Sequence, residues 1–372
     1  MFVGKFTDFY RDVTKKGTKI SQEEYKEIGS YPIIDQGKKL IAGRWDNGEG
    51  VFDDVPAIIF GDHTRAIKYI EEPFFIGADG VKILRPTNAQ DSTKYLYYAL
   101  QAARIPNLGY SRHFKALKEL EIRVYSREEQ DEIVRVLDKI DHLIEQRYKE
   151  ISCLNQLVKS RFVELFGDPA SNSPKWDTGR LGDYMTTLTD FSANGSYALL
   201  DSQVVMYDEP HYAIMVRTTD LETGDLKNGV KYIDQKAYEL LGKSKLFGGE
   251  MIMNKIGSAG KIYIMPHIET PASLGRNAFM FRFDQRVNMV FLYALLTSEY
   301  GTAEIQQHVR GAVTKTITKE STRSIRIIVP PIELQQQFAV FVKQVDKSKL
   351  AVQKSLDELE TLKKSLMQQY FG

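Results

Sequence analysis

Basic side chains and hydroxyl groups gather in short loop-like stretches in both halves of the sequence, and Tyr110 adds aromatic surface to one of them. Hydroxyls and backbone amides beside glycine bind nucleic-acid phosphates, and arginine, lysine or histidine reach base edges. Surface lysine and arginine are usually only solvated, but these stretches recur at equivalent places in the two halves, which favours contact with DNA. The candidate DNA-binding residues are Thr64, Arg65, Lys68, Ser111, Arg112, His113, Lys115, Lys255, Ser258, Lys261, Arg276, Arg310, Thr314, Lys315 and Lys319.

One nuclease-like arrangement competes with a simpler interpretation. Asp12 and Glu24-Tyr25-Lys26 offer the two carboxylates and the lysine used in metal-assisted phosphodiester cleavage. However, Ser21-Gln22-Glu23-Glu24 has the pattern of a helix N-terminus with acidic residues in its first turn, which explains the same carboxylates without chemistry. Because the second half has no counterpart, the sequence favours the helix cap.

Other catalytic patterns are incomplete. Gly242-Lys243-Ser244 is similar to the end of a phosphate-binding loop, but Ala237 occupies the position of its first glycine. The six histidines lack metal-ligand spacing, and Cys153 is the only cysteine, so a thiolate metal cluster is not possible. We therefore predict that this chain carries no catalytic residues, no bound cofactor and no metal.

The elements that position these loops are revealed by an internal duplication. Residues 122–167 align with residues 327–372 without a gap, at a constant offset of 205 residues, and both segments end in Phe-Gly. Gln130 falls on Gln335, Leu157 on Leu362, and Lys159-Ser160 on Lys364-Ser365. Insertions fall upstream of these segments, where the offset drifts, so each unit is predicted to be a globular domain followed by a long helix.

Each duplicated segment carries one apolar stripe at spacings of three and four, which predicts a helix of about 35 residues. A stripe could pack on its own domain, but its polar interruptions differ between the copies, which favours the two helices pairing as an antiparallel coiled coil. The predicted helix-pairing residues are Ile133, Leu137, Ile140, Ile144, Ile151, Leu154, Val158, Phe338, Val342, Val345, Val352, Leu356, Leu359 and Leu366.

Upstream of each helix, short β-rich runs are broken by glycine, proline, aspartate and asparagine. The predicted class is therefore α+β, with two mixed α/β domains, two long helices and an internal pseudo-two-fold duplication. The predicted domains are residues 1–121 and 168–326, each followed by a spacer helix at 122–167 and 327–372.

Composition is that of an ordinary globular protein: 372 residues, 42% hydrophobic and 27% charged, with a net charge of +1. Bulk charge therefore does not indicate a nucleic-acid binder, and the local clusters carry that prediction. The sequence has no apolar run of membrane-spanning length and no apolar core of a secretory signal near Met1, so we expect a cytoplasmic protein with no membrane partner.

Over essentially its whole length, the chain resembles the DNA-specificity subunits of type I restriction-modification systems. That family joins each recognition domain to a long helix through a segment like Pro-Pro-x-x-Glu-Gln. Residues 126–130 keep its Glu-Gln and residues 330–335 keep its prolines. Three further segments are similar to those of the family: Tyr31 to Gly37, Trp176 to Asp183, and the helix from Leu157 that ends in Phe166-Gly167.

The resemblance implies a non-catalytic subunit in which each recognition domain reads one half of a bipartite, asymmetric duplex DNA target. It implies that the helices fix the gap between the halves and dock two methyltransferase subunits, which supply S-adenosylmethionine and methylate adenine. Restriction subunits would add ATP-dependent cleavage, so S-adenosylmethionine, ATP and Mg belong to the partners.

Two alternatives remain. A standalone DNA-binding nuclease or methyltransferase needs a catalytic constellation, and added metal or S-adenosylmethionine would expose its activity. A non-catalytic coiled-coil scaffold accounts for the helices, and it predicts no salt-sensitive DNA binding.

Overall fold

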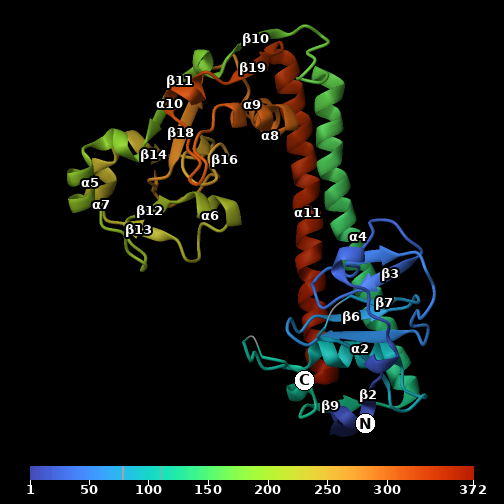
Figure 1. The fold of residues 1–372 in the computed structure, drawn as a ribbon. Helices are drawn as coiled ribbons and strands as arrows, with labels where there is room; N and C mark the ends of the chain where they lie inside the picture. Colours follow the sequence, from blue (N-terminus) through green and yellow to red (C-terminus); the bar gives the residue numbers. More distant parts are fainter. Residues whose placement is uncertain (78, 110) are drawn as a thin grey trace. The chain divides into compact units, whose positions relative to one another are not determined.

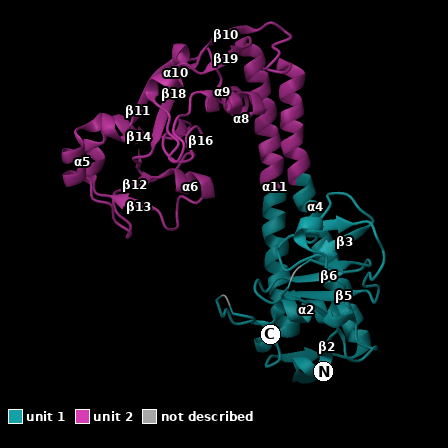
Figure 2. Cartoon of the chain, in the orientation of Figure 1, with its two compact units in different colours: residues 1–150, 352–372 teal, residues 151–351 magenta. Residues whose placement is uncertain are grey.

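The computed structural model describes residues 1–77, 79–109 and 111–372, so Tyr110 of the predicted first cluster lies outside the described residues. The chain divides into two units, residues 1–150 with 352–372 (unit 1) and residues 151–351 (unit 2) (Figure 2). Unit 1 is thus assembled from the two ends of the chain.

Two helices of 40 residues each dominate the secondary structure: α4 (Arg127–Phe166) and α11 (Ile332–Phe371) (Figure 1). Both are longer than the 35 or so residues expected from the apolar stripe. They begin later than the predicted starts at residues 122 and 327, because the residues there form the strands β9 (Glu121–Val124) and β19 (Arg326–Val329). A capping box starts α4, because the carboxylate of Glu129 accepts from the amide and the hydroxyl of Ser126, at 3.0 Å each. After α4 the chain turns at Gly167, whose φ of 73° lies in the left-handed region that favours glycine.

The two long helices contact each other within each unit. In unit 1, Asp141 on α4 pairs with Lys363 on α11 at 2.5 Å, and Arg147 Nε donates to Ser355 Oγ at 3.2 Å. Partner numbers fall along α11 as they rise along α4, so the helices run in opposite directions there. In unit 2 the end of α4 meets the start of α11, where Phe162 and Phe338 lie 5.5 Å apart edge to face. All the side chains predicted to pair the helices are buried or half-buried.

The globular part of unit 1 contains an antiparallel four-stranded sheet in the order β2-β8-β5-β6. A two-stranded ribbon, β1-β9, and a three-stranded sheet, β4-β3-β7, accompany it. The strands are β1 (Phe2–Lys5), β2 (Tyr10–Asp12), β3 (Tyr31–Ile34), β4 (Gly43–Trp45), β5 (Ala57–Gly61), β6 (Ile67–Ile70), β7 (Phe75–Ile76), β8 (Val81–Pro86) and β9 (Glu121–Val124), and the short helices are α1 (Phe6–Phe9), α2 (Thr93–Ala102) and α3 (Phe114–Leu117).

Unit 2 repeats this plan with an antiparallel sheet in the order β11-β18-β15-β16 and a ribbon, β10-β19. Its second sheet, β13-β12-β17-β14, has four strands. The elements are β10 (Asp177–Arg180), β11 (Met185–Asp190), β12 (Ala213–Val216), β13 (Lys231–Ile233), β14 (Lys245–Leu246), β15 (Met251–Asn254), β16 (Ile262–Ile264), β17 (Ala272–Leu274), β18 (Ala278–Phe283), β19 (Arg326–Val329), α5 (Tyr197–Gln203), α6 (Thr218–Thr223), α7 (Gln235–Leu240), α8 (Met289–Thr297), α9 (Glu299–Gln307) and α10 (Lys319–Arg323). The mixed α/β class with two domains, predicted from the sequence, is confirmed.

Each long helix is fastened to its preceding domain by one fully buried glutamine. The side chain of Gln130 accepts from the Ser92 amide at 2.8 Å and donates to the Tyr125 carbonyl at 3.0 Å. Gln335 makes the same pair of bonds in unit 2, to the Asn288 amide and the Pro330 carbonyl, at 2.7 Å each. Ser92 and Asn288 are the N-caps of α2 and α8. The glutamine of the duplicated signature therefore satisfies buried backbone groups where two helices and a strand meet.

The helices α4 and α11 are long enough to cross a bilayer, but no helix in the described part of the chain combines that length with sufficient apolar character.

We predict that Gln335→Ala lowers the free energy of unfolding of unit 2 by about 2–3 kcal/mol, because a buried N–H and a buried carbonyl lose their partner. The neighbouring Gln336 is exposed, so Gln336→Ala is the matched control and changes stability little. Trp45 and Trp176 are the only tryptophans and lie one in each unit. In a Trp45→Phe background, the change of Trp176 fluorescence with denaturant therefore reports the unfolding of unit 2. Equal unfolding midpoints for Gln335→Ala and Gln336→Ala would contradict a stabilising role of Gln335.

Candidate nucleic-acid interface

Two loops of unit 2 are joined by backbone hydrogen bonds at one end of the β11-β18-β15-β16 sheet. Residues 255–261 connect β15 to β16, and residues 308–318 connect α9 to α10. The amide of Gly257 donates to the Lys315 carbonyl at 2.9 Å, and the amide of Ile317 donates to the Lys255 carbonyl at 3.0 Å. Candidate residues from sequence positions some 60 apart are thereby brought onto one surface.

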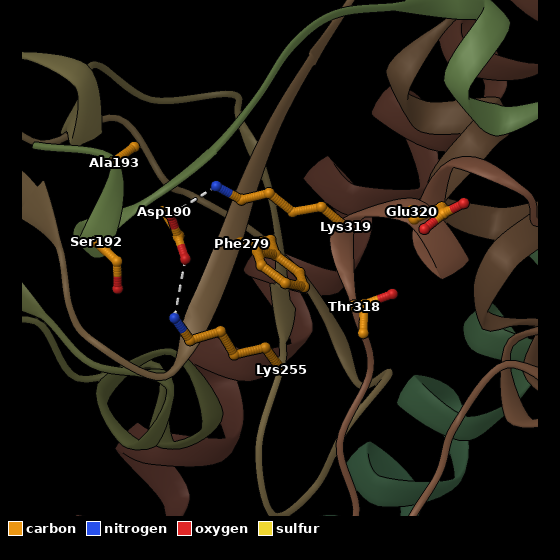
Figure 3. Close-up of a pocket in the computed structure, with 8 residues that line it drawn as sticks. All are labelled: Asp190, Ser192, Ala193, Lys255, Phe279, Thr318, Lys319 and Glu320. Carbon is orange, nitrogen blue, oxygen red and sulfur yellow. Dashed lines mark hydrogen bonds and ion pairs between the residues drawn. The ribbon is translucent and has the colours of Figure 1, made fainter.

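The carboxylate of Asp190, at the end of β11, lies between two of the candidate lysines (Figure 3). Its oxygens accept from Lys255 Nζ at 3.0 Å and from Lys319 Nζ at 2.7 Å. Burial by itself would raise the pKa of Asp190, but the hydrogen bonds from Lys319 and Lys255 outweigh it and hold the pKa below its ordinary value. The carboxylate is therefore ionised at neutral pH and ties both loops to the sheet.

A cavity of about 550 Å³ opens beside this triad. Its wall includes the hydroxyls of Ser192 and Thr318, the ring of Phe279 and the carboxylate of Glu320 (Figure 3). Only Lys319 of the two lysines keeps substantial exposure, 38% of its side chain against 14% for Lys255. Lys319 is thus the lysine of this pair that can exchange Asp190 for an external anion.

The remaining unit 2 candidates are all exposed, and two of them are paired with a carboxylate. Arg276 pairs with Asp201 at 2.5 Å and lies over the Phe191 ring, and Lys261 pairs with Glu222. Ser258, Arg310, Thr314 and Lys315 are exposed as well. Ser258, Arg310, Thr314 and Lys315 come from the two joined loops, and Lys319 is the first residue of α10. The turn carrying Arg276 contacts the first loop through the Lys255 amide and the Asn277 carbonyl, 2.9 Å apart.

Unit 1 gathers its candidates at the corresponding hairpin. Residues 62–66 connect β5 to β6, and Arg65 Nη1 donates to the carbonyl of Ile105 in the loop that follows α2, at 3.3 Å. Thr64 Oγ1 donates to the Gln36 carbonyl. Ser111, Arg112 and Lys115 are exposed on the later part of the same loop and the start of α3. Hairpin and loop are adjacent in this unit as they are in unit 2.

Two unit 1 candidates are buried and support the fold instead. Lys68 is 5% exposed, and its ammonium donates to the Asp35 carbonyl at 2.8 Å and pairs with the Asp35 carboxylate at 3.3 Å. Burial lowers the pKa of Lys68, and Asp35 offsets part of that effect. Strand alternation explains the placement, because Lys68 lies on the same buried face of β6 as Ile70.

His113 is 1% exposed. Its Nδ1–H donates to the Asp62 carbonyl at 2.8 Å, and its Nε2 accepts from the Leu108 amide at 3.0 Å, so the ring is a neutral imidazole with both nitrogens used. Burial therefore removes Lys68 and His113 from the set of side chains that reach an external ligand. Both were predicted to bind DNA because the sequence shows their type but not their burial.

Buried acids that support these loops were not predicted from the sequence. Asp190 holds Lys255 and Lys319, which lie 65 and 129 residues away in the chain. In unit 1 the carboxylate of Asp62 accepts from the Phe114 amide at 2.7 Å and so fixes the start of α3. Neither role leaves a local sequence signal, because the partners are distant in sequence.

The nuclease-like residues have structural partners. Ser21 and Glu24 form a capping box on a short 3-10 helix, Gln22–Glu24, as the sequence favoured. Asp12 accepts from Thr14 and pairs with Lys82 at 3.1 Å. Among the described residues, no group of three or more histidine, cysteine, aspartate or glutamate side chains is arranged to hold a metal ion.

These features define a class of protein with two repeated mixed α/β units, each with paired loops at one end of its main sheet, and two long helices to which both units contribute. Residues 7–152 and 176–361 match the family model described as the type I restriction modification DNA specificity domain. The match covers most of the sequence, and the chain belongs to this family.

Curated relatives are type I specificity subunits. The MjaVIII specificity subunit of Methanocaldococcus jannaschii is 21% identical over 390 residues, covering 98% of this chain and 90% of the relative. The EcoR124I/EcoR124II specificity subunit of Escherichia coli is 21% identical, covering 88% and 82%. Among solved structures, the S subunit of the type I system from M. genitalium aligns with a TM-score of 0.60 and 18% identity, over 100% of this chain and 96% of that one. This likeness supports the fold.

We predict that Asp190→Ala loosens both joined loops of unit 2, because it leaves Lys255 half-buried without its carboxylate partner. Hydrogen exchange at the Gly257 and Ile317 amides should accelerate, and the free energy of unfolding should fall by about 1–3 kcal/mol. Asp201→Ala breaks a solvent-exposed pair and is the matched control, with little effect expected on either quantity. If the hydrogen-exchange rates of the Gly257 and Ile317 amides are unchanged in Asp190→Ala, the backbone hydrogen bonds alone hold the two loops together.

Proposed function

We propose that this chain is the DNA-specificity subunit of a type I restriction-modification complex and that each unit reads one half of a split, asymmetric duplex target. The observation that carries the proposal is the exposed cationic surface that joined loops form in both units. In unit 2 it comprises Arg310, Thr314, Lys315 and Ser258, with Lys319 beside them. In unit 1 it comprises Ser111, Arg112 and Lys115, with Thr64 and the half-exposed Arg65 beside them. Hydroxyl, guanidinium and ammonium groups in such loops bind phosphates and base edges.

We further propose that α4 and α11 pair as an antiparallel coiled coil that sets the number of unread base pairs between the half-sites. The opposed directions of the helices within unit 1 support this, as do the buried positions of their apolar stripes. Two linked readers bind tightly only when both half-sites lie at a compatible separation. Helix length is therefore expected to set the spacing of the target.

The helices are also proposed to dock two methyltransferase subunits. Leu157 and Leu362 are equivalent in the duplication, identical, and exposed to almost the same extent, 47% and 48%. Lys159-Ser160 and Lys364-Ser365 are likewise identical and exposed. Burial in a core does not explain identity at exposed positions of two otherwise diverged helices. Two copies of one partner, each binding the same surface, do explain it.

On this proposal the chain itself is non-catalytic and works in the cytoplasm. Methyltransferase subunits supply S-adenosylmethionine, and restriction subunits supply ATP- and Mg-dependent cleavage. The ion-paired or capping roles of Asp12 and Glu24 support a division of labour in which the chemistry belongs to the partners.

The decisive experiment maps adenine methylation in genomic DNA from cells that carry or lack this chain, with the methyltransferase subunit present in both. We expect a split motif with a fixed gap to be methylated only when the chain is present. In cells carrying Arg310→Ala with Lys315→Ala, methylation should fall at sites of that motif, because phosphate contacts in unit 2 are lost. Arg112→Ala with Lys115→Ala tests unit 1 in the same way.

Other outcomes would select another function. Methylation that is unchanged without the chain would favour the coiled-coil scaffold. Methylation or cleavage by the purified chain alone, after addition of S-adenosylmethionine or Mg, would favour a standalone enzyme.

We predict that Leu362→Asp removes one of two bound methyltransferase subunits, weakening that contact at least about tenfold, because a charge replaces an apolar side chain that the bound subunit would cover. Leu157→Asp should remove the other subunit, and the double variant should bind neither. Leu350 is more exposed, at 72%, but its counterpart in the duplication is Glu145, so Leu350→Asp is the control and should leave two subunits bound. Light scattering of the reconstituted complex measures the stoichiometry; two subunits on the double variant would place docking elsewhere.

A further inference from the structure

The most exposed large apolar side chain recorded in the structure is Val313, at 97%. It lies in the middle of the loop between α9 and α10, with Ala312 before it and Thr314 after it, and this sequence presents methyl groups at three successive positions. A single exposed valine is ordinary on a protein surface. The position of this one is not ordinary, because it lies between Arg310 and Lys315 of the proposed DNA-binding surface.

The backbone holds Val313 at the tip of a closed hairpin. Arg310 and Thr316 exchange both backbone hydrogen bonds, N–H to carbonyl, at 2.8 and 2.7 Å. Gly311 has a φ of 101°, and a Cβ atom there would lie 2.2 Å from the Thr314 carbonyl oxygen, so the turn requires glycine. Below the tip, the backbone at Thr316 also bridges Ile256 of the neighbouring loop. The tip is thus supported from one side and open on the other.

This shape and chemistry suit the major groove of duplex DNA. The major groove is wide enough for an α-helix or a two-stranded β-ribbon, so a loop closed by one backbone bridge also fits, and the C5-methyl group of thymine is an apolar group exposed there. Arg310 and Lys315, on the two arms of the hairpin, supply positive charge for the phosphates that border the groove. Valine is branched at Cβ and has few rotamers to lose, so it presents a rigid apolar surface to a methyl group.

We infer that the hairpin of residues 310–316 enters the major groove and that Val313 recognises the C5-methyl group of a thymine in the half-site read by unit 2. The inference rests on the proposed function, since it assumes that unit 2 reads duplex DNA. It makes Val313 a specificity-determining residue, while Arg310 and Lys315 contribute affinity.

The test uses the complex of this chain with its methyltransferase subunits and duplexes that carry the mapped target. Each thymine of the unit 2 half-site is replaced in turn by deoxyuridine, which removes one methyl group and leaves base pairing unchanged. At one position we expect binding of the unaltered protein to weaken about fourfold, the factor for losing burial of one methyl group. Val313→Ala should weaken binding to the thymine duplex by at least that factor and should no longer distinguish thymine from uracil there.

Ile28→Ala is the control, because Ile28 is an exposed apolar side chain, at 85%, in unit 1. It should leave the thymine-uracil ratio unchanged. The inference is overturned if Val313→Ala keeps the full ratio, if no thymine in the half-site responds to deoxyuridine, or if the half-site contains no thymine, while specific binding persists. Loss of specific binding by the unaltered protein to every duplex would instead overturn the proposed function.

Discussion

Burial of both ends of each long helix is the constraint on which the rest of the structure depends. The first turns of α4 place Ile133 and Leu137 in the core of unit 1, and its last turn places Phe162 and Phe166 in the core of unit 2. α11 begins with Phe338 in the core of unit 2 and ends with side chains packed on the core of unit 1. Neither core is complete without residues from a distant part of the chain, so folding of the globular parts and docking of the helices are linked.

Buried polar groups then specify how each part is attached. Gln130 and Gln335 satisfy an N-cap amide and a carbonyl at the start of a long helix, and Asp190 and Asp62 fix the loops at the far end of the sheets. A buried polar group without its partners destabilises the folded state. Each of these side chains therefore favours the one packing of helix or loop in which its hydrogen bonds are made. The loops that carry exposed basic side chains are therefore held by buried aspartate side chains.

The sequence alone predicted what depends on local periodicity and duplication. The apolar stripes indicated both long helices, and the Ser21 to Glu24 pattern indicated a cap, because each signal lies within a few residues of its effect. The prediction of DNA contact was wrong for Lys68 and His113, which are buried. The identity of a single basic residue does not show whether its side chain points outward or into a core. The helices are also five residues longer than the stripe indicated, because at the start of α4 the capping turn Arg127 to Gln130 has no apolar residue and so lies outside the stripe.

The pattern of divergence between the two units bears on their different tasks. Several equivalent positions are identical in the two halves of the duplication: Gln130 and Gln335, the closing Phe-Gly pairs, and the exposed Leu157 and Leu362. The hairpins differ, with Asp62 to Ala66 in unit 1 and Lys255 to Lys261 in unit 2, although they connect equivalent strands of sheets with the same order. Identical exposed residues suit one partner bound twice, whereas different hairpins suit two different ligands. This combination agrees with the proposed function, in which one chain reads two different half-sites and binds two copies of one partner.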